Sequence, residues 1–110
     1  MSSELRAQKG DTVSLHYLGK YVGGQVFDTS IESEARKHGM YTPARDYKPL
    51  QVVLGQGQVI QGFEEAIMGM KINEEKEITI APEKAYGKTG RHPMAGKTLV
   101  FKLRVTHIKR

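Results

Sequence analysis

A change of hydrophobic period at residue 59 constrains the fold of this chain more than any other feature of its sequence. Before that position, apolar and polar residues alternate or form short apolar runs, which is typical of β-strands. From there to residue 70 the apolar residues recur at helical spacing, at Val59, Ile60, Phe63, Ala66, Ile67 and Met70. Polar residues occupy the opposite face, namely Gln61, Glu64 and Glu65. Residues 59–70 are therefore predicted to form one main amphipathic helix.

Segments with strand-like patterns surround this helix. Residues 12–19 alternate, so that Val13, Leu15 and Tyr17 share one face. Gly23 and Gly24 then predict a hairpin into a short second strand that ends near Phe27. Further strands are expected within 50–55, 71–80 and 99–108. Antiparallel strands packed on a single main helix define an α+β domain.

Two segments show neither period. The first is residues 30–50: Thr29, just before it, stands at capping-box spacing from Glu32, and Gly39 is a possible terminator, which predicts a short helix followed by loop. Residues 81–98 contain two prolines and three glycines and are predicted to be loop.

Length and composition limit the class of protein. The chain has 110 residues, which suits one domain with its own core, and no cysteine, which excludes disulfides and thiolate chemistry. Residues 1–11 are polar and charged, unlike a signal peptide, and no apolar run is long enough to cross a membrane. We therefore expect a soluble, cytoplasmic protein, with a monomer as the default state.

The net charge of +5 is unevenly distributed. Residues 1–83 carry 9 basic and 12 acidic groups, whereas residues 84–110 carry 8 basic groups and no acid. A basic end is compatible with a nucleic-acid or membrane-surface partner. However, Lys102 and Arg104 alternate with apolar neighbours, and no aromatic residues interleave the charges as base stacking would require. A solvated sheet face is the favoured interpretation, and nucleic-acid binding ranks last.

Conventional catalytic motifs are missing. The four histidines, at positions 16, 38, 92 and 107, have no metal-ligand spacing, and Ser14 and Ser30 have no activating motif. The glycines at 55, 57 and 62 do not match the spacing of a dinucleotide-binding loop. Neither a metal nor a cofactor is therefore expected. Several apolar residues instead stand at element ends, where such side chains can line a cleft rather than only the core.

At these residues the chain resembles the FKBP family of peptidyl-prolyl cis–trans isomerases. The matching segments are VSLHYLGKYVGGQVFDTS, PLQVVLGQGQVIQGFEEAIMGM, EEKEITIAPEKAYG and TLVFKLRVTHI. They cover nearly all of residues 12–108 in family order. HPMAGKTLVF and the long segment before Leu50 are most similar to the archaeal and SlyD-type branch.

One departure concerns the domain organisation. SlyD-type members usually carry an inserted substrate-holding domain between the AYG and HP segments, but here only residues 88–91 lie between Gly87 and His92. Residues 84–97 look like the short flap of single-domain members. The resemblance therefore implies one FKBP-like domain over 1–110, with about five antiparallel strands wrapped around the main helix. A natural member without the insert and a chain whose insert was replaced both fit the sequence, and either weighs against an independent chaperone activity.

Carried over by position, the resemblance implies an apolar proline site. Its catalytic residues would be Tyr17, Phe27, Asp28 and Tyr86. Its substrate-binding residues would be Leu50, Val59, Ile60, Phe63, His92, Met94 and Phe101. Phe63 stands where many relatives have tryptophan, and Leu50 where others have phenylalanine.

The implied function is a peptidyl-prolyl isomerase, or rotamase, that assists protein folding without covalent chemistry. Its partners would be proline-containing peptides and unfolded chains, and the macrolide inhibitors of the family are potential ligands. The Ile60 N–H and the Tyr86 hydroxyl would hold substrate carbonyls. Asp28 would either polarise the twisting amide or only hold the end of its strand, and both interpretations stay open. The alternative function is a peptide-binding or protein-binding module with little catalysis.

Overall fold

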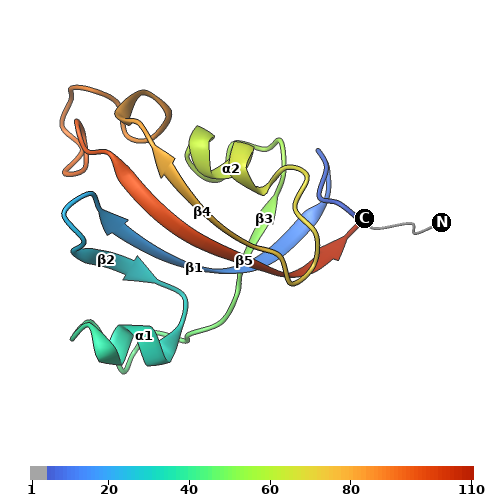
Figure 1. Cartoon of the computed structure of the whole chain (residues 1–110), viewed down its shortest axis with the longest axis horizontal. Coiled ribbons are helices and arrows are strands. Elements are labelled where there is room, and N and C mark those ends of the chain that lie inside the picture. The colour runs from blue at the N-terminus through green and yellow to red at the C-terminus, as the bar shows by residue number, and fades with distance from the viewer. Residues whose placement is uncertain (1–4) are drawn as a thin grey trace.

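Five antiparallel strands form one twisted sheet that curves around a short helix, as the computed structural model in Figure 1 shows. The structure describes residues 5–110; the first four residues of the polar start lie outside this range. The strands are β1 (Thr12–Tyr21), β2 (Val26–Thr29), β3 (Leu50–Val53), β4 (Glu75–Ile80) and β5 (Leu99–Lys109). The helices are α1 (Glu32–Lys37), α2 (Gln61–Ile67) and the 3-10 turn η1 (Pro82–Lys84). The α+β prediction is confirmed.

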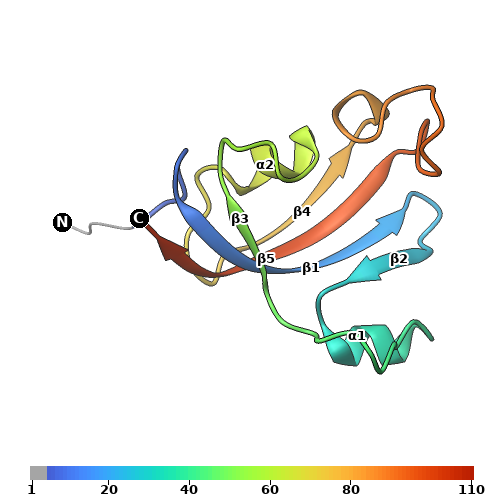
Figure 2. The same cartoon turned by 180° about the vertical axis from the view of Figure 1, so that it is seen from behind.

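Strand β1 organises the sheet because it is long enough to pair with three neighbours. One edge pairs with β5 along its whole length, from Thr12 opposite Lys109 to Tyr21 opposite Leu99. The other edge is shared: the first half of β1 pairs with β3 and the second half with β2. The remaining strand, β4, pairs with β5 on its far side. Figure 2 shows from behind that β3 lies at one end of the sheet and that β2 and α1 lie at the other end.

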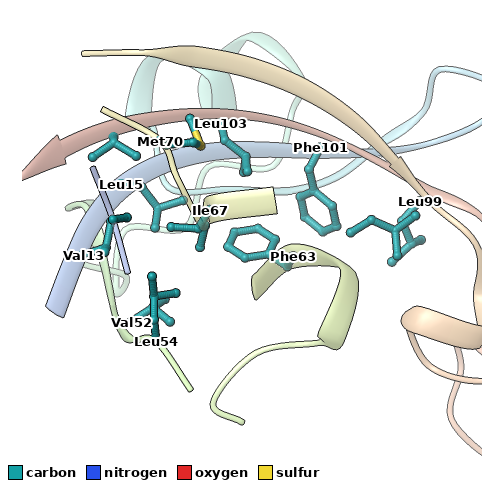
Figure 3. Packing of buried hydrophobic residues seen from close by; sticks show 13 residues of the cluster. Val13, Leu15, Val52, Leu54, Phe63, Ile67, Met70, Leu99, Phe101 and Leu103 are labelled. Atoms are coloured by element: carbon teal, nitrogen blue, oxygen red, sulfur yellow. The ribbon is translucent and has the colours of Figure 1, made fainter. Parts of the chain in front are cut away.

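The core lies between the concave face of the sheet and α2, as Figure 3 shows. Every secondary-structure layer contributes fully buried side chains, among them Leu15, Leu54, Ile67, Met70, Leu99, Leu103 and Val105. Each such side chain contributes roughly 1.5–3 kcal/mol of transfer free energy. Helix α2 approaches β4 closely because Gly62 has no side chain; a Cβ there would lie 2.5 Å from Cγ2 of Ile80.

Helix α2 is shorter than predicted at both ends. It spans Gln61–Ile67 rather than 59–70, and Ile60 is still extended, with φ −60° and ψ 150°. At the other end Gly69 adopts φ 84°, which ends the helix. The residues after the helix hydrogen-bond to the N-terminal segment instead: the Gly69 N–H donates to the Ala7 carbonyl, and the Ala7 N–H donates to the Met70 carbonyl. The backbone groups of Gly69 and Met70 therefore form hydrogen bonds with a distant segment in place of those of the last predicted helical turn.

The segments around the loops need further corrections. Helix α1 exists, but the predicted capping box is wrong: its N-cap is Ile31, with no side-chain cap. The hydroxyl of Thr29 instead donates to the Tyr17 carbonyl at 2.7 Å, which joins β2 to β1. Gly39 ends the helix as expected, with φ 69°. The predicted second strand continues beyond Phe27 to Thr29, and the predicted loop 81–98 contains η1.

The outer face of the sheet carries the basic residues of β5, as predicted for a solvated face. Lys102 and Arg104 are exposed. Their partners on β4 are Glu77 and Glu75, so each cation lies opposite an acid across the strands. Two of the 8 basic groups of residues 84–110 are therefore balanced locally at this face. Among residues 5–110, no helix has both the length and the apolar character needed to cross a membrane.

Candidate functional site

Four aromatic rings from four elements meet at one end of the core: Tyr17, Phe27, Phe63 and Phe101, which we call the four-ring cluster. Phe101 is its centre, with ring centroids 5.0 Å from Phe63, 5.6 Å from Phe27 and 6.3 Å from Tyr17. All three contacts are edge-to-face, a favourable arrangement for aromatic pairs. Figure 3 shows Phe63 on α2 directed toward Phe101 on β5. Phe63 and Phe101 are buried, whereas Tyr17 and Phe27 are partly exposed.

A β-bulge explains how two consecutive residues serve this cluster. Gly19 pairs with Asp28 while Lys20 pairs with Val26, so Phe27 is the extra residue of β2. In a regular strand, Phe27 and Asp28 would point to opposite faces. Here the Phe27 ring contacts Phe101 while the Asp28 carboxylate reaches the hydroxyl of Tyr17.

Asp28 lies at the centre of a polar network beside the rings. Its Oδ2 accepts a 2.7 Å hydrogen bond from the Tyr17 hydroxyl, and its Oδ1 accepts from the Thr29 N–H and from Nη1 of Arg45, both at 2.8 Å. Nη2 of Arg45 also donates to the Tyr17 hydroxyl oxygen at 3.3 Å. Burial, together with the hydrogen bond to Asp28, raises the pKa of Tyr17 to about 12. The phenol is therefore held as a neutral donor.

Arg45 is a site residue that the sequence analysis missed. It belongs to the irregular segment between α1 and β3, and its guanidinium also lies 5.0 Å from the ring centroid of Tyr47. Tyr47 stacks on Tyr41 at 5.8 Å, and Arg36 covers Tyr41 at 3.7 Å. This ladder of rings and guanidinium groups orders a segment that shows no period. The alternation of tyrosine and arginine around Pro43 was the only signal for it, and that signal does not name Asp28 as the partner.

The residues before α2 are half-buried at its start. Val59 and Ile60 pack against the core, and the Ile60 carbonyl accepts hydrogen bonds from the N–H groups of Phe63 and Glu64. Among residues 5–110, no acceptor lies within hydrogen-bond reach of the Ile60 N–H. Leu50 also packs on the core, and it lines a cavity of about 530 Å³ together with Tyr17 and Arg45.

Three predicted site residues form a separate group in the loop after η1. The rings of Tyr86 and His92 stack at 4.0 Å with an interplanar angle of 10°, and Nδ1 of His92 accepts the N–H of Met94. Met94 packs on the core, while Tyr86 is 37% exposed. A hydrogen bond from the Gly96 N–H to the Gly87 carbonyl closes the base of this loop. Within the described residues, the Tyr86 ring contacts His92 and none of the rings of the four-ring cluster.

Comparison with known proteins decides what this arrangement belongs to. The model of the FKBP-type peptidyl-prolyl cis-trans isomerase family matches residues 3–106. The chain belongs to the FKBP family. The resemblance inferred from the sequence is thereby confirmed.

Three relatives of this FKBP-type chain are compared by sequence identity and by the share of each chain that is covered. A short-type peptidyl-prolyl cis-trans isomerase of Methanocaldococcus jannaschii is 49% identical over 80 residues, which is 73% of this chain and 50% of the relative. FK506-binding protein 2 of Yarrowia lipolytica is 42% identical over 98 residues, covering 87% of the chain and 59% of the relative. FK506-binding protein 1A of Neurospora crassa is 38% identical over 104 residues, covering 93% and 76%. The chain thus spans between half and three quarters of the length of these relatives.

His16 and Ser30 of this FKBP-type chain have structural roles near the strand ends. Nδ1 of His16 lies 3.0 Å from the hydroxyl oxygen of Ser30. That oxygen also accepts the Tyr17 N–H at 2.8 Å, and Ser30 is buried, so the pair cannot present a nucleophile. Burial, and then the charge of Arg104, lower the pKa of His16.

The glycine-containing turn before α2 also serves the fold. The Gly55 N–H, which a phosphate-binding loop would turn toward its ligand, donates to Oε1 of Glu64 at 2.6 Å. Residues 5–110 hold no group of three or more side chains suited to a metal ion. The distinctive chemistry is an apolar aromatic cluster bordered by a fixed phenol and carboxylate.

Proposed function

We propose that this chain is a peptidyl-prolyl cis–trans isomerase that accelerates rotation about X–Pro bonds in peptides and unfolded proteins. The observation that carries the proposal is the four-ring cluster beside the Tyr17–Asp28–Arg45 network in a chain of the FKBP family. The activity printed in the name of the methanogen relative supports it.

The physical basis is the difference in polarity between a planar and a twisted amide. Resonance makes the planar amide dipolar and opposes rotation with a barrier of ~18–20 kcal/mol. The twisted amide has lost that charge separation, so an apolar surface disfavours the planar ground state relative to the transition state. No bond is formed or broken, and no nucleophile is required. A proline ring placed on the partly exposed rings of Tyr17 and Phe27, with the buried Phe63 and Phe101 beneath them, would meet such a surface.

Hydrogen bonds would orient the peptide around that ring. The Ile60 N–H has no acceptor within the described residues and is the proposed donor to one substrate carbonyl. The exposed hydroxyl of Tyr86 is the proposed donor to another. Val59, Leu50, His92 and Met94 would border the bound peptide. We expect the family's macrolide inhibitors to compete for this surface, with an affinity altered by Phe63 and Leu50.

For Asp28 we propose a positioning role. Both of its oxygens already accept hydrogen bonds from protein groups, which leaves little capacity for a bond to substrate. The carboxylate fixes the phenol of Tyr17 and the guanidinium of Arg45 at the border of the four-ring cluster. Its electrostatic field at the twisting amide is the second contribution, and it depends on the same geometry.

The proposal extends to the whole chain as one SlyD-like domain without an insert. Residues 84–97 would act as a short flap, closed at its base between Gly87 and Gly96. We propose a cytoplasmic monomer that catalyses folding without an independent chaperone arm. The pairing of Lys102 and Arg104 with glutamates supports the absence of a nucleic-acid partner at the outer sheet face.

Two substrates test the proposal. The chain should accelerate isomerisation in a proline tetrapeptide, and should accelerate proline-limited refolding of a protein only weakly, since no holding domain is inserted between Gly87 and His92. Absence of acceleration with either substrate, in a chain shown to be folded, would overturn the isomerase. Tight binding of the tetrapeptide in that case would establish the alternative, a binding module.

A further inference from the structure

We infer that Gly19 is a positioning residue of the proposed isomerase site, because its missing side chain makes the space in which the rings of Phe27 and Phe101 lie. The inference rests on the proposed function and deepens it. Neither the motifs nor the family resemblance singles out this residue. The structure places it beneath the four-ring cluster.

Gly19 lies directly between two residues of the proposed site on the neighbouring strands. On one side it pairs with Asp28 of β2, and on the other it pairs with Phe101 of β5. Cross-strand partners direct their side chains to the same face, so the side of Gly19 that would bear a Cβ faces the cluster. Gly19 is buried, so no solvent fills this position.

The Phe27 and Phe101 rings fill the vacant place. A Cβ built on Gly19 would lie 2.7 Å from Cζ of Phe27 and 2.7 Å from Cε1 of Phe101. Both distances are shorter than carbon atoms in contact allow, which is about 3.5–4.0 Å. The contacts are with aromatic rings rather than with the ends of flexible chains. A single methyl group would therefore displace at least one ring.

Backbone conformation does not explain the glycine. The positive-φ residues include nine other glycines but not Gly19, so another residue could adopt its backbone. Glycine in the interior of a strand is otherwise unfavourable, because it loses more conformational freedom and packs no side chain. The space that it leaves for two rings accounts for its presence within β1.

Neighbouring contacts limit how Phe27 could yield. Its ring packs on Tyr21 with centroids 4.9 Å apart and meets the edge of Phe101 at 5.6 Å. The β-bulge fixes its backbone next to Asp28. A ring pushed away from β1 would therefore move toward the place proposed for the substrate proline. The missing side chain of Gly19 thus determines how closely the rings of Phe27 and Phe101 pack on the sheet.

The test compares Gly19→Ala with Gly23→Ala as the matched control. Gly23 also lacks a positive φ, and a Cβ there would have no heavy atom within 4 Å. With a proline tetrapeptide, Gly19→Ala should lower kcat/KM by on the order of tenfold to 100-fold, since a misplacement of about 1 Å in a site can have that effect. Gly23→Ala should retain the kcat/KM of the wild type.

Ring positions provide a second readout. The chain has only 3 phenylalanines, at positions 27, 63 and 101, and all belong to the four-ring cluster. NMR of ring-13C phenylalanine therefore reports each ring separately. Gly19→Ala should shift the signals of Phe27 and Phe101 and create cross-peaks from both rings to the new methyl group, while Gly23→Ala should leave the spectrum unchanged.

A double variant keeps the test decisive if Gly19→Ala fails to fold. Phe27→Leu removes the Phe27 Cζ and Cε1 atoms that the new methyl would meet and leaves only its contact with Cε1 of Phe101. In that background Gly19→Ala has one ring to displace instead of two, so it should be less destabilising, and its further loss of kcat/KM should be smaller than the loss expected in the wild-type background.

Three results would overturn the inference: a folded Gly19→Ala variant with the kcat/KM of the wild type, unmoved ring signals, or full additivity with Phe27→Leu. A wild-type chain without activity would instead overturn the proposed function, and the NMR comparison would still show whether Gly19 places the rings.

Discussion

The hydroxyl of Tyr17 donates a 2.7 Å hydrogen bond to the carboxylate of Asp28, across the junction of β1 and β2. The same carboxylate accepts a hydrogen bond from Arg45. The Arg45 guanidinium is held in place by Tyr47, which stacks on Tyr41 in the same segment between α1 and β3. The Tyr17–Asp28 hydrogen bond connects the four-ring cluster to the polar residues beside it. It is also the part of the proposed site that point mutations can test most simply.

Removal of the carboxylate should impair turnover more than folding. Asp28→Ala leaves the Tyr17 hydroxyl, the Thr29 N–H and Arg45 without their acceptor, so we expect destabilisation of about 1–3 kcal/mol. The ion pair itself contributes little of this, because the Arg45 and Asp28 side chains are 41% and 39% exposed. Urea unfolding gives the stability, and tetrapeptide isomerisation gives kcat/KM, which should fall by about tenfold or more.

Asp46→Ala is the matched control for Asp28→Ala. The Asp46 side chain is 85% exposed, and its ion pair with Lys48 is long, at 3.9 Å. This variant should retain both stability and turnover. A folded Asp28→Ala variant with unchanged kcat/KM would remove Asp28 from the mechanism.

The raised pKa of Tyr17 predicts a loss of stability in alkaline solution. The ordinary pKa is 10.0 and the folded value is about 12, so the folded state holds this proton more tightly than the unfolded state. The free energy of unfolding should keep this contribution below pH 10 and lose it as the pH rises toward 12. Denaturant titrations across that range measure the slope.

Tyr17→Phe isolates this contribution from the other alkaline groups. The variant should lose the part of the slope that belongs to Tyr17. Tyrosinate absorbance should also show a phenol that ionises near pH 12 in the wild type, and the variant should lack this phenol. Equal slopes in both proteins would show that the folded state does not raise the pKa of Tyr17.

The hydroxyl of Tyr86 should matter for substrate and not for the fold. Tyr86→Phe keeps the ring that stacks on His92 and removes only the donor proposed for a substrate carbonyl. We expect kcat/KM to fall by up to about tenfold, the effect of one neutral hydrogen bond, with no change in thermal unfolding. Tyr86→Ala, which also loses the stacking, should be worse. Wild-type activity in Tyr86→Phe would exclude the hydroxyl as a donor.

Gly62→Ala should destabilise the protein, although a glycine-to-alanine substitution in a helix usually stabilises it. Alanine in place of an exposed helical glycine normally stabilises by about 1 kcal/mol. At this position the methyl would lie 2.5 Å from Cγ2 of Ile80, a stiff β-branched side chain. We therefore expect net destabilisation of about 1–3 kcal/mol in urea unfolding. A more stable variant would show that α2 does not pack so closely on β4.

Much of the fold followed from periodicity, because the alternation in β1 and β5 and the helical spacing around Phe63 reflect one buried face each. The helix ends did not follow from it. Met70 continues the apolar stripe, yet the pairing of Ala7 with Gly69 and Met70 ends the helix earlier. Such a partner lies more than sixty residues away, where no local pattern can indicate it.

The meeting of the aromatic residues of the candidate site could be predicted from residue type, whereas the features that depend on tertiary contacts could not. Tyr17, Phe27, Phe63 and Phe101 do come together. Arg45 reaches Asp28 from a segment without periodicity, and Gly19 matters through an absent side chain, which no motif displays. The β-bulge that turns Phe27 and Asp28 to one side is likewise a property of strand pairing.

Exchange NMR on a proline tetrapeptide is the decisive test of catalysis by the four-ring cluster, since it measures cis–trans interconversion at equilibrium without a coupling protease. With a catalytic amount of the folded chain, we predict faster exchange with nearly the same rate in H2O and D2O, because an apolar surface twists the amide and no proton is transferred. An exchange rate that the folded chain leaves unchanged, or one that slows strongly in D2O, would contradict the account.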